Sequence, residues 1–248
     1  MNKKIVVLVL FIMSLNLIMP ITAQNMVITY GMDSKKQISA FKQEMQNPGE
    51  SENFKRLANL SLKATLEAEK STYSLEIDKD KSFFYLDELM LSDANGSSVN
   101  ELARMNADRG DFYQDATTKQ VLEKRSGSKL FINYGFDFFD WELIKETETI
   151  LGYTCYKAIA KYTEPHPAGG NDLRREIIVW YAPELPFNFG PQGYGGLPGL
   201  ILKKCQSGSC FVATKIETKK VKIKWPKGET ITREKYSKKN ENTQFKFN

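Results

Sequence analysis

Short apolar segments, separated by turn-forming residues, follow one another along most of this chain. From Leu60 to Ala68, apolar residues alternate with polar ones, which predicts a strand with one buried face. The alternation resumes from Tyr73 to Ile77 after a short polar break, which predicts a hairpin. Because few long helical patterns interrupt these segments, we expect a mainly β (α+β) fold with a curved antiparallel sheet or half-barrel.

Further strands are predicted at Met26–Tyr30, Ser82–Leu86, Lys119–Lys124, Lys129–Tyr134, Trp141–Ile144, Tyr153–Tyr162, Arg175–Tyr181, Leu200–Lys204, Phe211–Glu217 and Lys220–Trp225. Ile38, Phe41 and Met45 recur at helical spacing before Pro48 and predict a short N-terminal helix. A second short helical pattern, formed by Phe54, Leu57 and Leu60, is expected to run into the next strand. Asn100–Asp108 is expected to form one or two helical turns.

The N-terminus has the pattern of a secretion signal. Lys3 and Lys4 precede an apolar run that ends near Ala23, a small residue suited to signal peptidase. A membrane anchor is the alternative, but Ser14, Asn16 and Pro20 interrupt the run. With no cysteine near the junction to accept a lipid, we expect a periplasmic or secreted protein that is not transmembrane after cleavage. The expected organisation is a signal peptide (1–23), one β-rich domain (24–232) and a basic, flexible tail (233–248).

Three cysteines remain in the mature chain, and export exposes them to oxidising conditions. Cys205 and Cys210 flank a turn-forming tetrapeptide, so a hairpin would bring them within disulfide range, and a pair of free thiols is the alternative. Cys155 is left over. The three cysteines and His166 have zinc-ligand chemistry, but their spacing matches no known zinc motif, and no metal or other cofactor is expected.

The sequence carries no catalytic set. His166 is the one histidine, and it lies between two prolines in a loop (Thr163–Asn171), where a solvated turn residue is the plainer interpretation. The glycines at 193–199 lack the lysine and hydroxyl residue of a phosphate-binding loop. Whether the protein is an enzyme stays uncertain, with a non-enzyme favoured. Nucleic acid is not expected as a partner outside the cytoplasm.

Three other segments have both a structural and a binding interpretation. Ala182–Gly196 is expected to be an ordered surface loop, because its aromatic residues would pack on something. The aromatic run Tyr134–Trp141 is expected in the core, with a platform for a lipid or sugar as the alternative. Glu217–Asn248 has ten Lys or Arg against four Glu, and it is interpreted as a charged edge strand and tail or as a contact for anionic lipid or an acidic partner.

Gly196–Ile201 spells GLPGLI, and with its surroundings it resembles the GLPGLI family of exported proteins, found mainly in Bacteroidetes. Trp141, Glu146–Ala158 and Val179–Pro186 fall in the order that this family shows, so the resemblance covers roughly residues 130–217. The His166 loop and the Cys205/Cys210 pair depart from the pattern. The family is uncharacterised, so the resemblance implies no catalytic residue, and by analogy it implies a fold similar to the lipoprotein-carrier (LolA-like) half-barrel.

The leading expectation is therefore an exported cell-envelope protein that binds an apolar small molecule or lipid, or an outer-membrane protein partner. The alternatives are a structural or assembly accessory of the envelope and a hydrolase. The motif itself is favoured as structural, because its glycines permit close backbone approach while its leucines enter the core. The candidate binding residues around it are Trp180, Phe187, Phe189, Tyr194, Gly196, Pro198 and Gly199.

Overall fold

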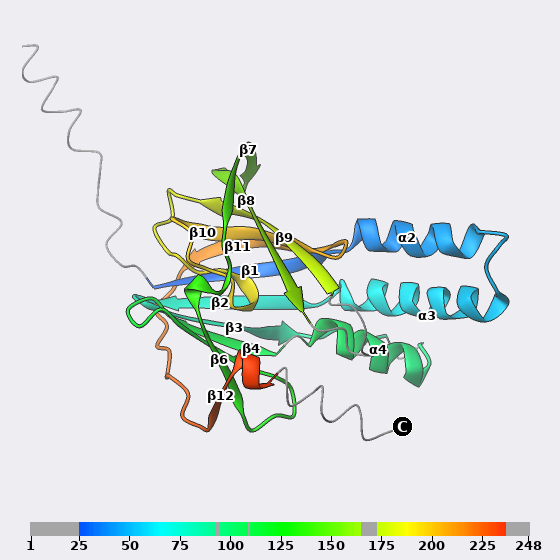
Figure 1. Ribbon diagram of the computed structural model, residues 1–248, viewed down its shortest axis with the longest axis horizontal. Helices are drawn as coiled ribbons and strands as arrows, with labels where there is room; N and C mark the ends of the chain where they lie inside the picture. The colour runs from blue at the N-terminus through cyan, green and yellow to red at the C-terminus, as the bar shows by residue number, and fades with distance from the viewer. Residues whose placement is uncertain (1–24, 93–94, 109, 165–172, 237–248) are drawn as a thin grey trace, which may run out of the picture.

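Two consecutive antiparallel half-sheets join into one open, curved sheet of twelve strands (Figure 1). The computed structural model describes residues 25–92, 95–108, 110–164 and 173–236. The strands are β1 (Met26–Asp33), β2 (Thr72–Asp78), β3 (Lys81–Glu88), β4 (Asp111–Asp115), β5 (Gln120–Lys124), β6 (Phe131–Gly135), β7 (Glu142–Ile150), β8 (Tyr153–Glu164), β9 (Leu173–Ala182), β10 (Leu200–Gln206), β11 (Ser209–Thr218) and β12 (Thr230–Thr232). The expected mainly β, curved antiparallel sheet is confirmed.

The order of the strands shows how the halves meet. Each strand from β1 to β5 pairs with the next strand along the chain, and so does each strand from β7 to β10. The two halves are joined where β1 pairs with β11, with Met26 opposite Thr218. Short β12 then adds to β6 in parallel.

Three helices lie side by side at one end of the sheet: α2 (Lys35–Gln46), α3 (Glu52–Ala68) and α4 (Ser97–Ala107) (Figure 1). Helices α2 and α3 form the connection between β1 and β2, so they extend past the end of the strands. Short 3-10 helices η2 (Phe136–Phe138) and η3 (Pro191–Gly193) occur in the loops.

The strand predicted at Leu60–Ala68 is wrong, because these residues belong to helix α3. Ala58, Leu62 and Thr65 are buried at spacings of four and three residues, which is the helical period, while Leu66 is 42% exposed. Leu, Ala, Lys and Glu are also strong helix formers, and Ser51 caps the helix by accepting from the Phe54 amide. The alternation of apolar and polar residues in this segment arises because apolar residues occur on two faces of one helix.

The core fills the concave side of the sheet with aromatic rings. Tyr73 and Phe84 stack with their centroids 5.7 Å apart, and Phe211 packs edge-on against Tyr73 at 4.7 Å. Tyr30 lies 6.1 Å from Phe84 and donates a hydrogen bond from Oη to the Ile201 carbonyl at 2.6 Å. These contacts tie β1, β2, β3 and β11 to β10, across the line where the two half-sheets meet.

Candidate functional site

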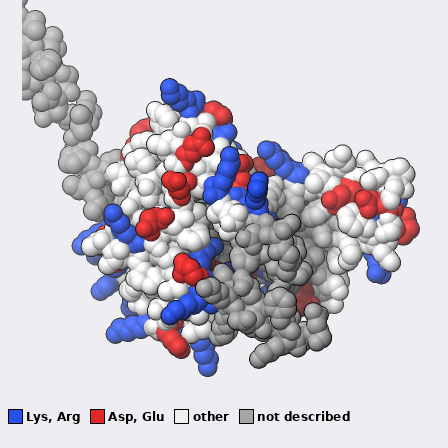
Figure 2. Space-filling view, in the orientation of Figure 1, with Lys and Arg blue, Asp and Glu red and all other residues white. Residues whose placement is uncertain are grey.

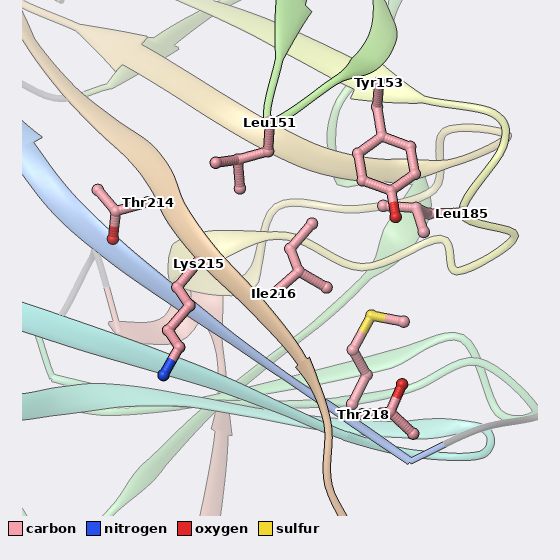
Figure 3. Close-up of a pocket in the computed structure, with 8 residues that line it drawn as sticks. Leu151, Tyr153, Leu185, Thr214, Lys215, Ile216 and Thr218 are labelled. Atoms are coloured by element: carbon pink, nitrogen blue, oxygen red, sulfur yellow. The ribbon is translucent and has the colours of Figure 1, made fainter.

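An open groove of about 510 Å³ lies at the end of the sheet where β1 begins and β11 ends (Figure 3). Its volume falls within the range of roughly 300–1,000 Å³ typical of small-molecule sites. The residues that line it come from four separate parts of the chain: Met26, Leu151, Tyr153, Leu185, Thr214, Lys215, Ile216 and Thr218.

Apolar and polar surface contribute about equally to the lining of the groove. Met26 and Leu185 are buried residues of this lining, and Leu185, Ile216 and the Tyr153 ring face the same space (Figure 3). The side chain of Lys215 points away from these residues, and its amine pairs with Glu217 at 2.9 Å. Tyr153, Thr214 and Thr218 contribute hydroxyl groups to the lining, which suits an apolar molecule with a neutral polar group.

Leu151 forms the exposed wall of the groove. It occupies the β7–β8 turn with Gly152, and both residues have positive φ, 51° and 85°, as in a type I′ hairpin turn. Asn or Asp normally occupies the first of these positions, because a bulky side chain is strained there. Here a leucine stands at that position with 45% of its surface exposed. Neither the turn nor the core requires leucine at this position, so the side chain is available for contact with another molecule.

The loop between β9 and β10 folds back into the concave side of the sheet instead of covering its surface. The expectation of an ordered surface loop is wrong in its placement, since Phe187, Phe189 and Tyr194 are all at least nine-tenths buried. The Phe189 ring packs edge-on against Phe136, and the Tyr194 ring lies 4.7 Å from Phe139. These three candidate binding residues are placed in the core of the molecule.

Gln114 on β4 holds this loop through its side-chain amide. Its Nε2 donates to the carbonyls of Gly193 and Tyr194, 3.2 Å each, and its Oε1 accepts from the Gly190 amide at 3.4 Å. Trp141 Nε1 donates to the Gly195 carbonyl at 3.0 Å. Gln114 is fully buried in a strand that the sequence did not predict, so no local pattern indicated its role.

The GLPGLI segment packs along the end of β9. A Cβ at Gly199 would lie 2.5 Å from the Ala182 carbonyl oxygen, so only glycine allows this approach. Leu197, Leu200 and Ile201 are buried, whereas Gly196 and Pro198 are exposed.

Trp180 lies apart from these residues, beneath two lysines. Lys203 Nζ is 4.5 Å from the centre of its ring, and Lys157 Nζ is 5.8 Å from it. The candidate binding residues therefore do not form one site. They are distributed between the core, the exposed part of the GLPGLI motif and a cation–π cluster.

Lys204 is a polar residue of the concave side that sequence reasoning missed. It is 4% exposed, and its Nζ donates to Gln192 Oε1 at 2.8 Å and to Gln206 Oε1 at 2.9 Å. The same ammonium lies 4.8 Å from the centre of the Tyr194 ring. Burial raises the pKa of Tyr194 well above its ordinary value, so the phenol is neutral at physiological pH.

The cysteine prediction is confirmed. Cys205 and Cys210 face each other across the β10–β11 ladder and form a disulfide. Cys155 is a buried free thiol, and burial raises its pKa to about 11, which makes it a poor nucleophile. His166 and the expected signal lie outside the described residues.

In the described part of the chain, neither a group of metal ligands nor a membrane-spanning helix is found. Within it, no three His, Cys, Asp or Glu side chains come together as metal ligands. Nor does any helix of that part have the length and apolar character required to cross a membrane.

Comparisons with known proteins add a fold and a short family match. No curated protein matches the chain. Two solved structures of PNGF-II, in space groups P21 and C2, align with a TM-score of 0.51 each, at 17% and 16% sequence identity. The alignments cover 87% and 89% of this chain but 33% of the PNGF-II chain, so this chain spans about a third of that protein's length.

The likeness to PNGF-II shows a shared β-rich fold. The expected similarity to the lipoprotein carrier stays a prediction. Residues 169–203, which include β9 and the GLPGLI segment, match a family described as "Protein of unknown function (Porph_ging)".

Proposed function

We propose that the protein is a non-catalytic binding protein of the cell envelope that holds an apolar ligand in the groove beneath Leu151. The observation that carries the proposal is this open groove, which is lined by Met26, Leu185 and Ile216 together with an exposed leucine at a strained turn. Burying an apolar side chain or acyl segment in such a groove contributes about 0.8 kcal/mol for each methylene removed from water.

A location in the cell envelope is part of the same proposal. The N-terminal export pattern and the resemblance to the exported GLPGLI family support a cell-envelope location. The Cys205–Cys210 disulfide is consistent with it, because such bonds persist in oxidising compartments. The curved sheet also supports the analogy with the lipoprotein carrier.

The candidate binding residues expected from the sequence lie around the GLPGLI motif, whereas we propose that the ligand binds in the groove at the end of the sheet. The concave side of the sheet, where a carrier of this shape would hold a ligand, contains the buried rings of Phe187, Phe189 and Tyr194. The groove at the end of the sheet is open, and its lining does not require the core to rearrange.

Binding of N-phenyl-1-naphthylamine, a neutral apolar dye that fluoresces when it leaves water, tests the groove. We expect saturable binding by the purified protein and a dissociation constant about tenfold weaker for Leu151→Asn, the value of one partly buried leucine. Asparagine suits the type I′ turn, so this variant should keep the hairpin. Leu143→Asn, which removes a 58% exposed leucine from β7 outside the groove, is the matched control. Unsaturable binding, or equal binding by both variants, would refute the proposal.

A further inference from the structure

A lysine-rich segment crosses the end of the sheet beside the groove. We call Lys219–Lys227 the lysine strap; it runs from the end of β11 towards β12 (Figure 1). The strand predicted at Lys220–Trp225 is wrong, because this segment pairs with no strand of the sheet. The alternation that suggested a strand persists: Val221, Ile223 and Trp225 are partly buried, and all five lysines of the strap are exposed.

The strap is fixed in place by contacts along its length. The Lys219 amide donates to the Asn25 carbonyl at 3.1 Å, and Asn25 Nδ2 donates to the Val221 carbonyl at 2.7 Å. Further along, the Ile223 amide donates to Asp78 Oδ2 at 3.3 Å, and the Trp225 ring packs edge-on against Tyr113. The lysines are therefore displayed outward from an ordered backbone.

The strap begins at the groove. Lys219 directly follows Thr218, and Asn25 directly precedes Met26; Thr218 and Met26 both line the groove. The end of the molecule that bears the groove is opposite the helices α2, α3 and α4, and Lys and Arg side chains are prominent along it in Figure 2. An apolar groove and a row of cations thus share one face.

The charge of the strap is not neutralised locally. Its nine residues contain five lysines and no acid. Among the described residues, no carboxylate lies within ion-pair distance of a strap lysine; neighbouring Glu217 pairs with Lys215, and Asp78 accepts the Ile223 amide. Protection of an edge strand does not explain these lysines, because the strap is not part of the sheet.

We infer that the lysine strap docks this end of the molecule on an anionic lipid surface, so that the groove beneath Leu151 faces the lipid. This inference rests on the proposed function, since it names a lipid surface as the source of the apolar ligand. Each lysine near an anionic surface strengthens binding about fivefold. Three strap lysines together therefore account for roughly a hundredfold in the partition coefficient.

Sedimentation with phosphatidylcholine vesicles, with and without phosphatidylglycerol, tests the inference. We expect the protein to bind the anionic vesicles, and the variant Lys220→Gln/Lys222→Gln/Lys224→Gln to bind them roughly a hundredfold more weakly. The matched control is Lys36→Gln/Lys42→Gln/Lys63→Gln, which removes the same charge from exposed positions on α2 and α3. The control should bind the vesicles nearly as well as the parent protein.

Three results would overturn the inference. The first is vesicle binding by the strap variant that equals binding by the parent protein. The second is an equal loss of vesicle binding by the strap variant and the control variant, because net charge alone would then explain the effect. The third is binding to soluble polyglutamate as tight as binding to vesicles, which would point to an acidic protein partner. Dye binding measured on the same samples separates the two proposals. If the protein binds vesicles through the strap but does not bind the dye, only the proposed ligand-binding groove is refuted. If the protein binds the dye but its vesicle binding does not depend on the strap lysines, only the proposed role of the strap is refuted.

Discussion

The side-chain amide of Gln114 on β4 donates a hydrogen bond to the carbonyl of Tyr194, 80 residues along the chain, at a distance of 3.2 Å. Gln114 is fully buried, and Tyr194 belongs to the loop that fills the concave side of the sheet. One polar side chain thus supplies partners for a backbone segment that has no strand neighbour of its own. Buried backbone groups need such partners, because leaving them unpaired costs free energy.

Gln114→Leu should lower the free energy of unfolding by about 1–3 kcal/mol, because it leaves buried backbone groups of Gly190, Gly193 and Tyr194 without their present partner. Urea unfolding followed by tryptophan fluorescence measures the change. Gln43→Leu, at an exposed position on α2, is the control. Equal destabilisation by the two substitutions would mean that the amide does not hold the loop.

Gly199→Ala should cost more than about 2 kcal/mol, because the new Cβ would lie 2.5 Å from the Ala182 carbonyl oxygen and 2.6 Å from the Ala182 carbonyl carbon. Gly96→Ala is the matched control, since a Cβ there meets no atom within 4 Å. Its cost should stay below about 1 kcal/mol. Thermal and urea unfolding of both variants test the difference, and a mild Gly199 variant would show that the motif is not required for packing.

The buried Cys155 thiol should make stability fall as pH rises. Burial raises its pKa from 9.0 to about 11, so above pH 9 the unfolded chain releases this proton while the folded chain keeps it. Each pH unit between those values then removes up to about 1.4 kcal/mol from the free energy of unfolding.

Other buried groups, such as Tyr30 and Tyr134, also have a raised pKa, so the comparison must be with Cys155→Ala. The variant should show a flatter decline in stability from pH 9 to 11. Parallel curves for the two proteins would assign the thiol no part in the decline.

Loss of the disulfide should lower the free energy of unfolding by about 2 kcal/mol, the chain-entropy value for so short a loop. Cys205→Ser/Cys210→Ser is the variant, and the parent protein in dithiothreitol should unfold at the same urea concentration as the variant does. The same treatment should leave the unfolding of the variant unchanged. A parent protein insensitive to reductant would contradict the prediction.

Periodic strands were predictable because each carries its own signal. β8, β9 and β11 were all predicted within a few residues of their ends, and the Cys205–Cys210 pair followed from the turn between them. β4 was missed because Asp111–Asp115 has two aromatic residues and otherwise polar ones. It becomes a strand because its neighbours β3 and β5 supply ladder partners on both sides.

The groove could not be predicted for a different reason. Met26, Leu151, Leu185 and Ile216 are distant in sequence, and only the pairing of β1 with β11 and the return of the β9–β10 loop bring them together. The one local signal was Leu151-Gly152, where a leucine occupies the turn position that favours asparagine. For the β9–β10 loop, the sequence indicated an ordered structure but did not indicate whether the loop lies on the surface or in the core, since aromatic residues pack equally well in both places.

The pairing of β1 with β11 also governs when the fold can be completed. Val27 lies opposite Glu217, so nearly the whole chain must be present before the two half-sheets join. Contacts between residues this far apart in sequence slow folding, because a large loop must close before any stabilising contact forms. During synthesis, β1 to β6 and β7 to β10 would therefore exist as separate meanders with unpaired edges until β11 emerges. The rate-limiting step of folding is expected to be a single late closure near the C-terminus.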